Sequence, residues 1–250
     1  MRTRDEALKL VQALLADGII GPRDLTRFLP TQSDPCDPEA VRQEWEHWYI
    51  SMGIETVIGR SFRLEGCPFT AEEIERADRE GEMILCVPRG IDRRQLASLF
   101  RMSTWALNDP LVGDTTEVED VWFKTPRSRT PEYLNKSATE ARRIMEDQNR
   151  LGFSLERYMV FCARYRFLYG TDPDFKYWIW LLRGRYDRSG ILIAGFDPMG
   201  SFSVHAWVPR FQASFVGVRF AQISSQLADA VPVSRQSAAA SAGAIPQLNE

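Results

Sequence analysis

The spacing of apolar residues predicts helices near the start of the chain. Between Asp5 and Ala16, apolar residues recur every three or four positions, which places them on one face of a helix. A short helix is expected from Pro22, and a longer one follows Asp37, a residue type that caps helix N-termini. We therefore expect residues 1–60 to form a helical N-terminal region.

A helix, a strand and a second helix are predicted next. Thr70 and Glu73 have the spacing of a capping box, in which each side chain bonds the backbone N–H of the other residue. A short apolar run at Met83–Val87 predicts a buried strand, and Asp92 is placed to cap the second helix. Residues 61–115 are therefore expected to form a small α/β unit.

One strand and two more helices are predicted before the pattern changes. The strand is expected at Val118–Thr125. Ser137 and Glu140 form a second capping-box pair at the start of a helix. A further helix between Ser154 and Gly170 carries apolar and aromatic residues on one side, which is typical of a core helix.

Beyond residue 176 the apolar period shortens from helical spacing to two. A period of two is typical of a strand with one buried face. Turn residues separate the apolar runs, and short turns join strands that lie antiparallel. The runs that predict this antiparallel meander are Tyr177–Leu182, Ile191–Phe196, Phe202–Val208 and Phe215–Ala221.

The turn at Asp197–Gly200 sets the register of the central hairpin. Its order of Asp, Pro and Gly is typical of a type I turn closed by a left-handed glycine. Pairing Phe196 with Phe202, and Ala194 with Val204, then gathers apolar residues on one face. The opposite face is expected to carry Ser203, His205 and Trp207.

These elements predict an α+β fold. Along the chain it consists of a helical N-terminal region, a small helix–strand–helix unit, and helices packed on a C-terminal antiparallel β-meander. Residues 116–228 are expected to form the α+β domain that contains the sheet. Residues 229–250 lack an apolar period and include a serine- and alanine-rich stretch, so a disordered tail is expected there.

Composition narrows the class of protein. The chain of 250 residues is 44% hydrophobic and 26% charged, which excludes a collagen-like or wholly disordered protein. Its apolar runs are far shorter than the roughly 18 residues that a membrane span needs. Its first residues are charged rather than typical of a signal peptide. We therefore expect a cytoplasmic protein with no membrane partner.

Charge and cysteine spacing argue against a bound metal or polyanion. The net charge is −3, although residues 151–221 carry more basic than acidic side chains. That excess permits an anionic partner but is small for a dedicated nucleic-acid binder. The cysteines stand far apart, and the acidic run Glu117–Asp120 is expected to be a solvated loop. We expect neither a metal nor a cofactor.

Common catalytic motifs are absent from the sequence. It contains no phosphate-binding P-loop, no dinucleotide-binding fingerprint, and neither the serine-hydrolase nor the zinc-protease motif. His205 is the strongest single candidate for catalysis, because histidine titrates near neutral pH and Ser203 shares its strand face. Catalysis would also need a carboxylate near His205. Without one, we expect a half-buried histidine beside Trp207.

Aromatic and basic residues are concentrated in the predicted meander. Planar rings stack on bases, sugars or protein side chains, and arginine binds carboxylate or phosphate through paired hydrogen bonds. Trp178 and Trp180 share one strand face, so core packing is the alternative for this pair. The candidate binding residues are Trp178, Trp180, Arg183, Arg185, Tyr186, His205, Trp207, Arg210 and Arg219.

The C-terminal half resembles a group of uncharacterised bacterial proteins. The resemblance begins at Val121 and rests on a series of short motifs in a fixed order. It implies a shared fold and assigns no catalytic residue, because that group has no known activity. The matching segments are Trp122–Phe123, Thr130–Asn135, Gly152–Tyr158, Trp178–Leu182, Gly190–Val204 and Gly217–Arg219.

Three functions are consistent with these features. We expect a non-enzymatic interaction protein that binds a protein or peptide partner through the aromatic and arginine surface of the C-terminal sheet. The first alternative is binding of single-stranded RNA or DNA by the same surface, with a steep dependence on salt. The second alternative is a hydrolase-like enzyme that uses His205. The sequence leaves the partner and the oligomeric state open.

Overall fold

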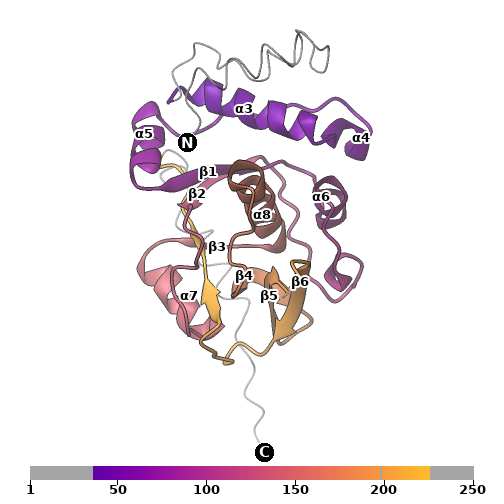
Figure 1. Cartoon of the computed structure of the whole chain (residues 1–250), viewed down its shortest axis with the longest axis vertical. Helices are drawn as coiled ribbons and strands as arrows, with labels where there is room; N and C mark the ends of the chain where they lie inside the picture. The colour runs from indigo at the N-terminus through magenta and orange to yellow at the C-terminus, as the bar shows by residue number, and fades with distance from the viewer. Residues whose placement is uncertain (1–35, 198, 226–250) are drawn as a thin grey trace, which may run out of the picture.

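The computed structural model describes residues 36–197 and 199–225 (Figure 1). The helices in these ranges are α3 (Pro38–Ser51), α4 (Ile54–Ile58), α5 (Ala71–Arg79), α6 (Arg93–Phe100), the 3-10 helix η1 (Trp105–Leu107), α7 (Ala138–Asp147) and α8 (Leu155–Tyr169). The strands are β1 (Glu82–Val87), β2 (Val121–Pro126), β3 (Leu151–Gly152), β4 (Trp178–Tyr186), β5 (Gly190–Phe196), β6 (Phe202–Trp207), β7 (Val216–Val218) and β8 (Phe220–Ala221). The helices predicted at Asp5–Ala16 and from Pro22, and the tail predicted at 229–250, lie outside the described residues.

The helix starts predicted within the described residues are confirmed, and the fold class is α+β as predicted. Thr70 accepts a hydrogen bond from the Glu73 backbone N–H, and the Glu73 carboxylate accepts one of 2.9 Å from the Thr70 N–H. Ser137 and Glu140 form the same reciprocal pair at the start of α7. A third capping box begins at Asp92 of α6. Local sequence therefore decides where these helices begin.

The first sheet brings the end of the described chain beside its middle. β1 and β2 pair antiparallel along their whole lengths. β2 begins at Val121 rather than at residue 118 as predicted, and Val118 is 91% exposed. Along the other edge of β2, Lys124 and Gln222 exchange two backbone hydrogen bonds of 2.8 and 2.9 Å. β8 then pairs antiparallel with β3.

The second sheet has the strand order β6-β5-β4-β7. Its central hairpin has the predicted register, with Phe196 opposite Phe202 and Ala194 opposite Val204. Gly200 closes the turn with a φ of 80°, the left-handed conformation expected there. The turn chemistry and the apolar pattern therefore specify the same pairing.

The last predicted strand differs from the meander. The run Phe215–Ala221 divides into β7 and β8, and β7 pairs parallel with β4 instead of antiparallel with a neighbour in the chain. β6 remains an edge strand, and the indole N–H of Trp105 donates a 2.6 Å hydrogen bond to its Val204 carbonyl. The chain returns on the other side of the sheet, where the Trp178 N–H bonds the Phe215 carbonyl.

One hydrophobic core connects the β1-β2 sheet with the four-stranded sheet. It includes buried residues from Val41 of α3 to Ala221 of β8. α8 lies at the centre of the molecule and contacts α6, β1, β4 and β5 (Figure 1). Because β1 and β2 come from the two sides of residue 115, the core crosses the domain boundaries predicted at residues 60 and 115.

Candidate functional site

The two faces of the β6-β5-β4-β7 sheet have different covers. Inner-face residues such as Leu181, Leu192 and Ala194 join the main core around α8. On the outer face, Ala138 and Ala141 of α7 pack with the β4, β5 and β7 side chains. Toward β6 the rings of the outer face are only half-buried or exposed. A binding surface on this sheet would therefore lie toward β6.

Aromatic side chains from β4, β6 and the loop after β6 form a set made of two contacting groups. We term it the outer aromatic cluster, and its members are Trp178, His205, Trp207, Phe211 and Phe215. The ring centroids of Trp178 and His205 are 4.8 Å apart, and those of Trp207 and Phe211 are 4.1 Å apart. The Phe215 ring is 6.3 Å from Trp207 and the residue is 43% exposed. These contacts hold the rings in place while leaving part of each at the surface.

His205 is exposed and its ring contacts Trp178, so its predicted half-buried position beside Trp207 is corrected. Gly195 lies between Trp178 and Ser203 in the strand register. The Trp178 ring is 3.5 Å from the point that a Cβ of residue 195 would occupy. The Trp178 ring thus lies over residue 195 of β5 and reaches His205 of β6.

Trp180 lies on the same strand face as Trp178 but is fully buried. Its indole N–H donates a 2.8 Å hydrogen bond to the Lys136 carbonyl, just before α7. It packs with Ala138 and Ala141 of that helix. Trp180 is therefore a core residue, as the alternative interpretation of the sequence held, and it is not part of the binding surface.

Arg219 also lies in the interior rather than on the predicted surface. Its guanidinium donates two hydrogen bonds of 2.7 Å to the Asp174 carboxylate, and both side chains are fully buried. It also donates to the carbonyls of Pro126 and Ser128. The guanidinium carbon is 4.7 Å from the centre of the Phe161 ring. Arg219 therefore joins three chain segments and is not accessible to a partner.

Arg183 and Arg185 point to different parts of the molecule. Arg183 is exposed and lies near the buried Arg157 of α8. Arg185 is exposed near Arg142 of α7, whose pKa is lowered by burial and by the Arg185 charge. The two arginines therefore lie near different helices.

Tyr186 and Arg210 complete the predicted set. Tyr186 packs edge-on against Trp105, with ring centroids 5.4 Å apart, and so lies away from the outer aromatic cluster. Arg210 is exposed in the loop after β6, next to Phe211 of the cluster. From the predicted set, the structure thus pairs Trp178 with His205 and places Trp207 against Phe211, the residue that follows the exposed Arg210.

The described residues offer no support for catalysis by His205. No hydrogen bond or ion pair joins its ring to a carboxylate in this part of the chain.

No group of three or more His, Cys, Asp or Glu converges as a metal site within residues 36–197 and 199–225. Burial raises the pKa of the Cys67 thiol to about 11, so it is protonated at neutral pH. In the same ranges, no helix combines the length and apolar character of a bilayer span.

The acidic run before β2 is not the solvated loop that was predicted. Glu117 is buried and forms a 2.7 Å ion pair with Arg157. The Asp120 carboxylate accepts hydrogen bonds of 2.6 and 2.8 Å from the backbone N–H groups of Glu65 and Arg89. These carboxylates hold distant segments together, and sequence spacing gave no indication of their partners.

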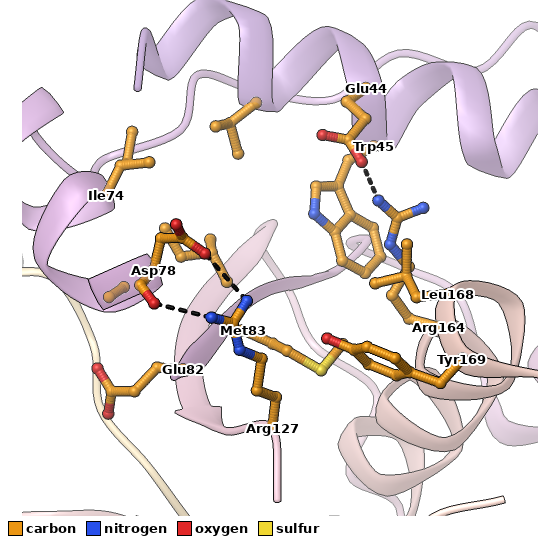
Figure 2. A pocket seen from close by; sticks show the side chains of 13 residues that line it. Glu44, Trp45, Ile74, Asp78, Glu82, Met83, Arg127, Arg164, Leu168 and Tyr169 are labelled. Carbon is orange, nitrogen blue, oxygen red and sulfur yellow. Dashed lines mark hydrogen bonds and ion pairs between the residues drawn. The ribbon is translucent and has the colours of Figure 1, made fainter. Parts of the chain in front are cut away.

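A pocket that the sequence did not indicate lies where α3, α5, β1 and the end of α8 meet (Figure 2). Its volume is about 290 Å³, close to the lower limit for small-molecule sites. These elements are far apart in the sequence, so no local pattern reveals that they border an open pocket. The apolar residues of its lining are Val41, Trp45, Ile74, Ala77, Met83, Ile84 and Leu168.

Two ion pairs lie on different sides of this pocket (Figure 2). Arg164 of α8 pairs with Glu44 of α3, and Arg127 pairs with Asp78 of α5 at 2.9 Å. The Tyr169 ring extends toward Met83 between them. The pocket therefore combines an apolar lining with fixed charges at its rim.

No protein-family model, curated protein or solved structure matches this chain. Its chemistry is therefore argued from the two features described above, the outer aromatic cluster and the pocket.

Proposed function

We propose that this is a non-enzymatic interaction protein that binds an extended segment of a partner protein on the outer aromatic cluster. The observation that carries the proposal is the cluster itself: two groups of contacting, partly exposed rings on and beside one sheet face, with an exposed arginine next to Phe211 in the chain that forms no ion pair among the described residues. Large rings and arginine are the side chains that contribute most to binding energy at protein interfaces.

The rings suit binding because their positions are already set. Trp207 contacts both Phe211 and Phe215, and Trp178 contacts His205. Side chains held in this way lose little conformational entropy when a partner covers them. Apolar side chains of the partner would cover the rings, and a carboxylate would pair with Arg210.

Charge favours a protein partner over single-stranded nucleic acid. Strong binding to nucleic acid requires several cations along one groove to neutralise phosphates. Of the four predicted arginines, Arg219 is buried against Asp174, Arg183 lies near Arg157 of α8, and Arg185 lies near Arg142 of α7. Arg210 remains beside the rings, which is enough for one carboxylate and too little for a phosphate backbone.

The experiment selects random displayed peptides on the full chain and then measures binding of a labelled enriched peptide by fluorescence anisotropy. We expect enriched peptides that combine aromatic or aliphatic residues with an acidic residue. Trp207→Ala should weaken binding about 10- to 30-fold, the effect of removing an interface hot spot. Arg210→Glu should weaken it through charge repulsion.

The matched control is Phe167→Ala, which removes an exposed ring of α8 outside the cluster. Equal binding by wild type, Trp207→Ala and Phe167→Ala would overturn the proposal, as would the absence of any enriched peptide. Labelled single-stranded RNA and DNA are measured in parallel at low and physiological salt. If RNA or DNA binds in a salt-sensitive way and both Trp207→Ala and Arg210→Glu abolish that binding, nucleic acid becomes the proposed partner in place of a protein.

A further inference from the structure

The polar wall of the pocket is built around a buried cation. The side chain of Arg164 is 6% exposed, whereas that of its ion-pair partner Glu44 is 62% exposed. The guanidinium carbon is 4.9 Å from the centre of the Trp45 ring and 5.3 Å from that of Trp48. Burial lowers the pKa of Arg164, as expected for a cation withdrawn from water.

The two members of this ion pair differ in how easily they can leave it. Arg164 is enclosed by rings and cannot move into water without unpacking them. Glu44 stands on the exposed side of α3, and its carboxylate can be hydrated at little cost. A buried cation needs an anion, but nothing requires that this anion be Glu44.

The rest of the pocket limits what else a ligand can carry. Trp45, Met83 and Leu168 provide an apolar lining beside Arg164. The charges on the opposite side are already balanced, because Arg127 pairs with Asp78 and Lys124 pairs with Glu82. A second anionic group on the ligand would therefore find no free cation there.

From this arrangement we propose that the pocket binds a small monocarboxylate with an apolar or aromatic body. Its carboxylate takes the place of Glu44 on the Arg164 guanidinium, and its body lies on Trp45, Met83 and Leu168. The guanidinium presents paired N–H donors that match a carboxylate. Glu44 turns into solvent when the ligand is bound.

This binding site is separate from the outer aromatic cluster. The pocket is formed by α3, α5, β1 and α8, whereas the cluster lies on β4, β6 and the loop after β6. The two proposals share no residue, so either one can fail without affecting the other.

The test titrates the full chain with 4-phenylbutyrate by calorimetry and by saturation-transfer NMR. The uncharged analogue 4-phenylbutyramide is the matched ligand, and we expect it to bind about tenfold more weakly because it lacks the anionic partner for Arg164. Leu168→Trp, a change at a partly exposed position, should fill the pocket and abolish binding.

Glu44→Gln gives the most specific result. Because it removes the anion that competes for Arg164, this variant should bind 4-phenylbutyrate several-fold more tightly than the wild type does. Glu146→Gln, which neutralises an exposed carboxylate of α7, should leave the affinity unchanged. Equal affinity for the acid and the amide, weaker binding by Glu44→Gln, or no binding of either ligand would overturn the proposal.

Discussion

The interior around Arg219 and the outer aromatic cluster contain the same kinds of side chain in different surroundings. In the interior, the guanidinium of Arg219 is bonded to Asp174 and to two carbonyls, and it lies against Phe161. On the outer face, Arg210 makes no ion pair with any described residue, and the rings beside it are partly exposed. Residue type identifies candidate binding residues. Only those whose side chains are not already bonded inside the protein can bind another molecule.

Replacing Arg219 by methionine should give the largest effect. The change leaves the Asp174 carboxylate buried without its cation. Losing one partner of a buried ion pair costs about 3 to 5 kcal/mol of unfolding free energy. Urea denaturation should show a much lower midpoint, and the double variant Arg219→Met/Asp174→Asn should recover part of the loss. Asparagine tolerates the φ of 52° at residue 174. A double variant no more stable than Arg219→Met would contradict an electrostatic cause.

The two tryptophans of β4 give the next contrast. Trp180→Ala should cost about 3 kcal/mol, because it empties a buried site and leaves the Lys136 carbonyl without its donor. Trp178→Ala removes a half-buried ring and should cost about 1 kcal/mol. Thermal and urea unfolding measure both. Equal losses would mean that the outer aromatic cluster is as structural as the core.

Gly195→Ala tests whether the empty space at residue 195 shapes the outer aromatic cluster. The added methyl group would lie 2.6 Å from the Tyr177 carbonyl oxygen and 3.5 Å from the Trp178 ring. Overpacking of this kind costs about 1 to 3 kcal/mol. The His205 ring protons should also shift in NMR spectra as Trp178 moves away. Gly66→Ala, where a Cβ meets nothing within 4 Å, is the control and should change neither measurement.

Glu73 is an intermediate case, since its buried carboxylate is held by hydroxyl and amide donors instead of a cation. Burial alone would raise its pKa, but hydrogen bonds from Ser225, Thr70 and Ser224 lower it overall. A lowered folded pKa gives stability that is present above the unfolded value of about 4.3 and is lost as the pH falls through the folded value. Glu73→Gln should therefore cost about 1 kcal/mol at neutral pH. The difference from wild type should shrink in acid unfolding below about pH 4, and a constant difference would contradict the assignment.

Features fixed by neighbouring residues could be predicted from the sequence. Thr70 and Ser137 begin helices because their partners lie three residues away. The hairpin register follows from a short turn and an alternating pattern on each side of it. In these cases the interacting groups are close in the chain, so one segment contains all the information.

Features fixed by distant segments could not be predicted. Trp178 and Trp180 have the same strand periodicity, and only the position of α7 decides that one is buried. Asp174 and Arg219 are 45 residues apart, and no motif links them. The pocket needs α3, α5, β1 and α8 to be in place before it exists.

The hydrogen bonds between Lys124 and Gln222 also bear on how the chain folds while it is being synthesised. β1 and β2 can pair as soon as both have left the ribosome, but Lys124 on the other edge of β2 has no strand partner within residues 36–197 and 199–225 until Gln222 emerges. Ser224 and Ser225 then bond Glu73 of α5 across about 150 positions. During that interval the nascent chain exposes an unpaired strand edge, which is the surface most prone to pairing with other chains and the one that chaperones protect.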